Sequence, residues 1–333
     1  MKQEKDSKRP SGRIPKGYRF EIFEKRLLRV LCHTSLPISV AVAISDWLWI
    51  FACGYAGLAS LPAYGWTFAI TLHVFVLWPL CARAQRGLEN LTHEASHFNF
   101  NRHAKNLNDL VANWLCSYWV LISVGMFREA HEPHHRYFGS VADPDKKRFS
   151  RLDLDRMPRQ SPYKLMIYLL RVLPTYLSDY WSQFSDKKGQ FIKSSLTHTV
   201  LVILVSATVY DKFWFLWLVY FWVPFILYLP LHRFFAEAEE HRYQDAETEF
   251  GSTFSNIGWF QRWFLHPHGD AFHLLHHMLP QVPHWKMTFG HWILSILDSN
   301  FEVGLYRRSI FDNPKRFVRT VAARVLTTKR MTR

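Results

Sequence analysis

The sequence predicts an all-α integral membrane protein: two transmembrane helical hairpins, four spans in all, that carry a cytosolic helical cap with a di-metal site. Three observations lead to this prediction. Four apolar stretches are long enough to cross a bilayer, they fall into two closely spaced pairs, and many of the 18 histidines form clusters beside those pairs. The chain has 333 residues, 49% of them hydrophobic.

The four apolar stretches define the predicted spans, because a transmembrane helix needs roughly 20 apolar residues. We place the spans at residues 36–61, 64–82, 194–210 and 213–231. Only Pro62 and Ala63 separate the first two, and only Asp211 and Lys212 separate the last two. Each pair therefore returns the chain to the side from which it came, and all other segments should lie on one face of the membrane.

The distribution of basic residues indicates on which side of the membrane that face lies. The net charge is +14, and residues 1–30 carry ten Lys or Arg against four acids, while residues 301–333 carry nine against two. Basic segments beside apolar spans favour the cytosolic side. We therefore expect a basic cytosolic segment at 1–35, a membrane domain at 36–300 and a basic cytosolic tail at 301–333. A bacterial inner membrane is favoured over the endoplasmic reticulum.

The excess of basic over acidic residues also indicates which partners the protein binds. No recognised nucleic-acid motif accompanies it, so nucleic acid is not an expected partner. Basic surfaces attract anionic lipid headgroups or an acidic acyl carrier. The four cysteines form no CxxC pair, which argues against a disulfide scaffold or an iron–sulfur cluster.

Two further apolar segments are not predicted to span. The segment Leu107–Phe127 contains Asp109 and Asn113, which suit a re-entrant or interfacial helix better than a full span. The segment Tyr163–Phe184 mixes apolar residues with charged ones and is typical of an amphipathic helix at the membrane interface.

The histidine clusters are the strongest indication of what the protein binds. They read His93-Glu-Ala-Ser-His97, His131-Glu-Pro-His-His135 and His273-Leu-Leu-His-His277. On a helix, residues three and four apart lie on one face, so each cluster can present its imidazoles together. The candidate ligands are His93, His97, His131, His134, His135, His273, His276 and His277. Eight imidazoles exceed the three or four protein ligands of one zinc ion, so two metals fit the number better.

Two other interpretations start from the same clusters. The first cluster alone matches HExxH, the helix motif of zinc proteases. A protease would leave both HxxHH clusters without a role. A metal transporter would line its spans with ligands, but only Asp46, His73 and His198 lie in or near the predicted spans.

Several residues outside the clusters are candidates for the same site. His241 follows the fourth span and shares a helix face with Glu237 at a spacing of four residues, so His241 is a candidate ninth ligand. His268 and Asp270 precede the last cluster, with His268 as a possible additional ligand. Glu94, Glu132 and Asp270 could accept imidazole N–H bonds and orient the rings. We expect the other histidines to be structural: His33, His73, His103, His198, His232, His284 and His291.

With these residues placed, the sequence resembles the integral-membrane fatty acid desaturase family of histidine-box enzymes. The three clusters carry the resemblance, together with Met278-Leu-Pro280 and Pro283 behind the last. Leu107-Asn-Asp109 and Asp143-Pro-Asp145, which follow the first and second clusters, also match. The resemblance runs from about residue 35 to residue 300.

The resemblance implies a di-iron centre that uses O2 to dehydrogenate an acyl chain, with the eight cluster histidines as iron ligands. In related acyl-CoA enzymes an Asn lies four residues before a further histidine; here Glu237 and His241 take those places. Glu94, Glu237 and Asp270 are the catalytic candidates. Relatives with the same clusters hydroxylate, ketolate or form acetylenic bonds, so these outcomes stay open.

The implied chemistry also needs partners. The substrate would be an acyl group on a lipid, CoA or an acyl carrier protein, held in an apolar tunnel lined by Phe and Trp. No haem domain, GxGxxG or CxxC motif is present to collect electrons. The expected donor is therefore separate, either ferredoxin or cytochrome b5 with its reductase.

Overall fold

The computed structural model describes residues 25–159, 161–243, 249–297, 305–312 and 315–316. Within these residues the protein is mostly helical, and four helical stretches are long and apolar enough to cross a membrane. These stretches are Leu27–Ser60, Pro62–Ser96, Lys188–Thr208 and Phe213–Glu237. Each predicted span overlaps one of them. Most of the N-terminal segment and of the basic tail lies outside the described residues.

The first hairpin begins with α1 (Lys25–Leu31) and α2 (Leu36–Leu72). The helix is interrupted at Gly65, where φ is 79°, a left-handed value that glycine adopts without steric cost. The break lies just beyond the expected one at Pro62 and Ala63. The returning arm consists of the part of α2 after Gly65, a π-helical turn, η1 (His73–Leu77), and α3 (Trp78–Ser96).

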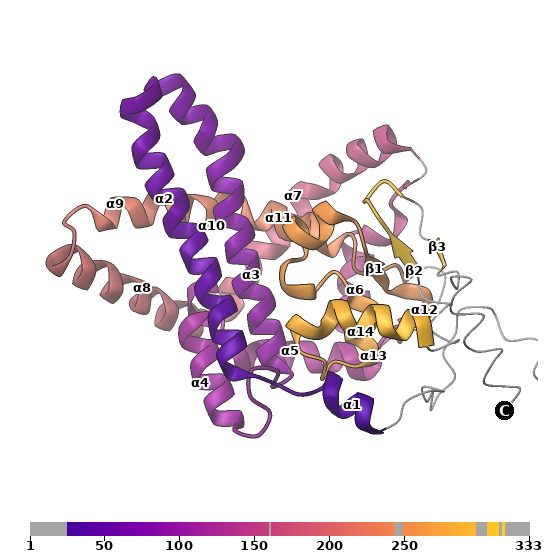
Figure 1. Cartoon of the computed structure of the whole chain (residues 1–333). Coiled ribbons are helices and arrows are strands. Elements are labelled where there is room, and N and C mark those ends of the chain that lie inside the picture. The colour runs from indigo at the N-terminus through magenta and orange to yellow at the C-terminus, as the bar shows by residue number, and fades with distance from the viewer. Residues whose placement is uncertain (1–24, 160, 244–248, 298–304, 313–314, 317–333) are drawn as a thin grey trace, which may run out of the picture.

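The second hairpin descends through α8 (Lys188–Thr208) and returns through four short helical elements. These are α9 (Phe213–Trp217), the π-helical η4 (Leu218–Trp222), α10 (Val223–Leu227) and α11 (Leu229–Glu237). Pro224 and Pro230 lie at the joints where η4 continues into α10 and α10 into α11, and each removes one N–H donor from this helical arm. In Figure 1 the two hairpins diverge on one side of the molecule.

Polar contacts join the hairpins at their π-helical turns. The Tyr228 hydroxyl donates to the carbonyl of Val74 in η1, with an O–O distance of 2.9 Å. In return, Nε2 of Gln85 donates to the carbonyl of Phe221 in η4 at 2.8 Å. Each hairpin therefore satisfies a main-chain carbonyl of the other.

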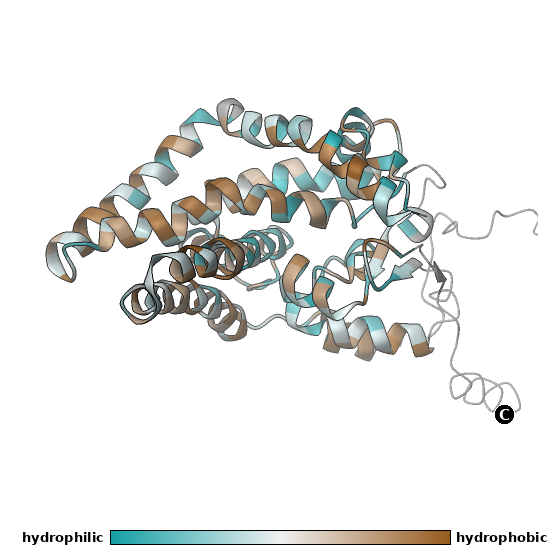
Figure 2. Ribbon diagram, turned by 90° about the horizontal axis from the view of Figure 1, so that it is seen from above, coloured by the Kyte–Doolittle hydropathy of each residue, from teal (hydrophilic) through white to brown (hydrophobic). Residues whose placement is uncertain are grey.

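Aromatic side chains fill the space between the hairpins. Trp217 and Phe221 stack with ring centroids 4.4 Å apart, and Trp47 from α2 stacks on Phe221 at 5.9 Å. The outer faces of the hairpins expose large apolar side chains, which suits contact with lipid. Figure 2 shows the hydrophobic residues concentrated along these helices.

Most of the remaining elements form a cap on the other side of the molecule, whereas α4 (Lys105–Leu115) lies below the hairpins (Figure 1). The part between the hairpins comprises α4, η2 (Ser117–Val120), α5 (Val124–Tyr137), α6 (Pro144–Arg151), η3 (Leu154–Arg156) and α7 (Pro162–Asp186). The part after the second hairpin comprises α12 (Glu249–Ser252), η5 (Gln261–Leu265), η6 (Pro267–Gly269), α13 (His273–Met278) and α14 (His284–Leu297).

The segment Leu107–Phe127 does not form a span, as expected. It begins in α4, passes through η2 and turns at Leu121, whose φ of 63° ends the helical path. The chain then enters α5, capped by the Ser123 hydroxyl. Because the segment folds back, α5 with its histidines lies beside α3.

The cap also contains a small sheet that the sequence did not predict. Strand β1 (Phe254–Asn256) pairs in parallel with β2 (Leu305–Arg307), which pairs antiparallel with β3 (Lys315–Arg316). The strands are two or three residues long, too short for a recognisable alternating pattern. They attach the described part of the expected C-terminal tail to the cap.

Candidate metal centre

Three elements deliver the first group of histidines. The end of α3 supplies His93 and His97, α5 supplies His131 and His135, and α13 supplies His276. One nitrogen of each ring lies within 4.8 Å of a nitrogen of every other. Residues far apart in sequence thus form one cluster.

The spacing of the nitrogens matches a shared metal ion. Nε2 of His93 lies 2.8 Å from Nε2 of His131 and 2.9 Å from that of His276. Nε2 of His135 lies 2.9 and 3.0 Å from the same two atoms. Metal–imidazole bonds of about 2.1 Å place neighbouring ligands about 3 Å apart. The donor set therefore fits a metal ion.

A second group adjoins the first. His134, His241 and His277 form one triplet, and His241 and His273 form another with Glu240. Nε2 of His134 lies 3.2 Å from Nε2 of His277, and Nε2 of His241 lies 3.1 Å from that of His273. All nine histidines predicted from the sequence, including His241, are therefore brought together in two groups.

His241 reaches the site by a route that the sequence did not predict. Helix α11 ends at Glu237, so the expected shared helix face of Glu237 and His241 is wrong. His241 instead forms an isolated β-bridge with Thr253, whose hydroxyl lies 3.3 Å from Nδ1 of His241. Glu237 forms ion pairs with Arg148 and Arg233 and none with a described histidine.

His268 and Glu132 also lie apart from the two groups. Nε2 of His268 is 2.6 Å from the carboxylate of Asp46 in α2, which also pairs with Arg83. His268 therefore ties the loop before α13 to the first hairpin, and it is a member of neither metal-binding group. Glu132 is exposed and pairs with Arg136.

Carboxylates contact the outer nitrogens of the clustered rings. Nδ1 of His134 lies 2.9 Å from Asp143 and 3.6 Å from Asp145. Asp143 is fully buried and also caps α6 through the N–H groups of Asp145 and Lys146. A proton on Nδ1 leaves Nε2 free to face a metal. The sequence resemblance had singled out Asp143-Pro-Asp145 without assigning it this contact.

Asp270 occupies the corresponding place for two other rings. Its Oδ1 lies 3.7 Å from Nδ1 of His93 and 3.8 Å from Nδ1 of His273. Its Oδ2 lies 3.3 Å from Arg86 and 3.4 Å from His266. Burial raises the pKa of Asp270, but the neighbouring His266, His273 and His93 and the positive charge of Arg86 hold it well below its usual value. The predicted orienting role of Asp270 is compatible with this geometry.

Glu94 stabilises the site from another side. Its carboxylate accepts hydrogen bonds from the Asn99 side chain at 3.0 Å and the His284 main-chain N–H at 2.7 Å. It also lies 4.0 Å from Nδ1 of His276. A zinc protease uses the glutamate of HExxH as a general base. Here the main-chain bond to His284 ties that carboxylate to the start of α14.

Residues that the sequence analysis did not assign hold the end of α3 in place. Arg128 donates to the carbonyls of Ser96 and Ala95 and pairs with Asp109. Asn108 donates to the Ala95 carbonyl at 2.8 Å. The matching Leu107-Asn-Asp109 motif was the available signal for this contact.

The clustered imidazoles are suited to binding cations. For the clustered rings outside the membrane-spanning stretches, burial is the largest cause that lowers the pKa of His97, His131, His135, His241, His276 and His277. For His134 burial acts in the same direction, but the carboxylates of Asp145 and Asp143 outweigh it and raise the pKa. Neutral imidazole is the metal-binding form, so most of these rings are ready to bind at neutral pH.

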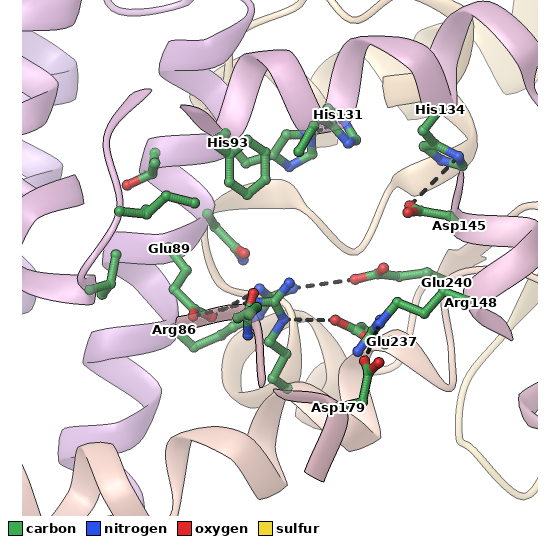
Figure 3. A pocket seen from close by; sticks show the side chains of 18 of the residues that line it. Arg86, Glu89, His93, His131, His134, Asp145, Arg148, Asp179, Glu237 and Glu240 are labelled. Atoms are coloured by element: carbon green, nitrogen blue, oxygen red, sulfur yellow. Dashed lines mark hydrogen bonds and ion pairs between the residues drawn. The ribbon is translucent and has the colours of Figure 1, made fainter. Parts of the chain in front are cut away.

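A cavity of about 570 Å³ opens beside the histidines. Figure 3 shows His93, His131 and His134 on one side and the charged residues Arg86, Glu89 and Glu237 on the other. Three phenylalanines and no tryptophan line this cavity. Its wall thus differs from the apolar tunnel expected for an alkyl chain.

Comparison with known proteins agrees with the site. The family model described as fatty acid desaturase matches residues 70–298, which include all nine clustered histidines. No curated protein matches the chain at a significant level. The matched region covers more than half of the 333 residues and both metal-binding groups. The chain therefore belongs to the fatty acid desaturase family.

Proposed function

We propose that the protein is a membrane-bound di-iron oxidoreductase that introduces a double bond into an acyl chain, using O2 and two electrons from an external donor. The observation that carries the proposal is the convergence of nine histidines in two adjoining groups. Imidazole-rich sites suit iron, copper or zinc, and the family supports O2-dependent oxidation of acyl chains. Two bound irons would supply the oxidising power that breaking an unactivated C–H bond requires.

The protein's own residues would hold the metals and orient the rings. His93, His97, His131, His135 and His276 would bind one iron, and His134, His241, His273 and His277 the other. Asp143 and Asp270 would keep the protons on the outer nitrogens of His134, His93 and His273. Glu94 would fix the relation between α3 and α14.

The proposal includes the surroundings of the site. Both hairpins return to the cap, and the basic ends of the chain support a cytosolic cap and cytosolic termini in a bacterial inner membrane. The acyl group would reach the site on a lipid, CoA or a carrier protein. Ferredoxin, or cytochrome b5 with its reductase, would supply the electrons.

The test is the metal content of the full-length protein purified in detergent, measured by elemental mass spectrometry. Wild type should hold close to two irons per chain, and His134→Ala should hold about one or none. The matched control is His103→Ala, because His103 is exposed and belongs to neither group. One zinc and no iron in wild type grown with added iron would overturn the proposal. An iron-loaded protein should then form an unsaturated product only when O2 and a reducing system are present.

A further inference from the structure

A ladder of ion pairs runs along the cavity beside the histidines. At its inner end Asp270 lies 3.3 Å from Arg86, and Arg86 lies 3.2 Å from Glu89. We call the alternating carboxylates and guanidinium groups that begin here the charged wall. Asp270, at this inner end, also lies 3.7 Å from Nδ1 of His93.

The charged wall continues toward solvent. Arg233 lies 3.6 Å from Glu89 and 2.7 Å from Glu237. Glu237 also pairs with Arg148, and Arg148 lies 2.7 Å from Asp179. The side-chain exposure rises from 9% at Arg86 to 24% at Arg148 and 61% at Arg151, which pairs with Asp179. The wall therefore leads from the cavity opening to the metal-binding groups.

The charged wall has hydrogen-bonding capacity left over. Nε of Arg86 is buried and has no hydrogen-bond partner among the described residues. Leaving a buried donor unpaired costs free energy, which a ligand that accepts this N–H would recover. Arg86 lines the cavity, so this N–H is a donor that a ligand in the cavity can use.

Apolar side chains also line the cavity. They are Val120, Leu121, Ile122 and Phe127, from the end of η2, the turn that follows it and the start of α5. A ligand in this cavity therefore meets apolar side chains as well as charges of both signs. Such a cavity fits an amphiphile whose polar part lies inside it, close to the histidines.

Resting on the proposed function, we propose that the substrate is an amphiphile with a zwitterionic head that binds along the charged wall. A head with one charge would meet a like-charged neighbour at every position, because signs alternate along the wall. A zwitterion can pair its cation with a carboxylate such as Glu89 and its anion with Arg86. The carbon that is oxidised then lies near the head of the molecule rather than midway along its alkyl chain.

The test compares three probes that share a C16 chain: 2-aminohexadecanoic acid (zwitterion), hexadecanoic acid (anion) and hexadecylamine (cation). Equilibrium binding to the iron-loaded full-length protein is measured in one detergent at pH 7. The zwitterion should bind at least tenfold more tightly than either singly charged probe. Equal or tighter binding of a singly charged probe overturns the proposal.

Substitutions in the charged wall test whether the zwitterionic probe binds there. Arg86→Gln should weaken binding of 2-aminohexadecanoic acid at least tenfold, and Glu89→Gln serves as a second variant if Arg86→Gln does not fold. Arg156→Gln is the matched control, since Arg156 is 77% exposed and lies outside the cavity. Unchanged affinity in the cavity variants overturns the assignment. A protein with two irons but no preference for the zwitterion refutes this inference alone, whereas a protein without two metals refutes the proposed function.

Discussion

Nδ1 of His134 lies 2.9 Å from Oδ1 of Asp143, and both side chains are buried. The aspartate begins α6, while the histidine lies near the end of α5. One carboxylate therefore both caps a helix and orients a ring of the second histidine group. Helix formation and the geometry of the metal centre depend on the same residue.

Replacement of that carboxylate should weaken metal binding. Asp143→Asn keeps the size of the side chain but removes the charge that faces Nδ1 of His134. We expect metal affinity to fall roughly 10- to 100-fold, as is typical when an outer partner of a metal-binding histidine is lost. Competition with a chelator measures the change. Asp145→Asn, at 3.6 Å and partly exposed, is the control and should have a smaller effect; equal losses in both would refute the prediction.

Gly87 should tolerate no side chain. A Cβ atom at this position would lie 2.3 Å from Oδ2 of Asp46 and 2.7 Å from Nε2 of His268. Gly87→Ala should therefore disrupt the Asp46–His268 contact and lower stability by about 1–3 kcal/mol, the usual cost of overpacking. The midpoint of thermal unfolding in detergent measures this. Gly189→Ala, with open space at its Cβ, should leave the midpoint unchanged or higher.

Acid should destabilise the cap through His291. Burial, with a smaller contribution from Arg262, lowers the pKa of His291 to about 3. The unfolded chain takes up a proton near pH 6.5, whereas the folded chain does so only near pH 3, so folding stability falls as the pH drops through this range. For this group the free energy of unfolding changes by up to about 1.4 kcal/mol per pH unit.

The matching variant is His291→Gln, which cannot take up that proton. Between pH 6.5 and pH 5 its thermal midpoint should fall less than that of wild type in the same detergent. Parallel pH profiles for the two proteins would show that His291 does not contribute to the acid sensitivity.

Metal removal should destabilise the wild-type protein. The nine rings come from α3, α5, α13 and the bridge at His241, so bound metals connect segments that are distant in the chain. A ligand that binds only the folded state raises stability by about 2.7 kcal/mol at 100 times its Kd. A chelator should therefore lower the thermal midpoint of wild type and change that of metal-depleted His131→Ala little. A wild-type midpoint that does not respond to chelation would contradict this prediction.

The sequence predicted the features that depend on local pattern. Apolar length placed the four spans, and spacing of three and four residues placed the histidines of each cluster on one helix face. The turn at Leu121, which keeps Leu107–Phe127 from spanning, agreed with the polar residues in that segment. These predictions need only the composition of one segment at a time.

Contacts between distant segments could not be predicted in this way. The pairing of Glu237 with Arg148 joins residues 89 positions apart, and no local pattern indicates it. The end of α11 at Glu237 removed the helical spacing on which the relation to His241 rested. His241 is nevertheless at the site, because its β-bridge to Thr253 brings it there. The short strands β1 to β3 depend in the same way on partners far away in the chain.

The exchanged bonds at the two π-helical turns limit how the hairpins can move. Sliding one hairpin past the other would break both bonds, to the carbonyls of Val74 and Phe221, in a region where no water is available to replace them. The two bonds therefore hold the hairpins in a fixed position relative to each other. The spans therefore serve as a fixed base for the cap and for the metal-binding groups that it holds.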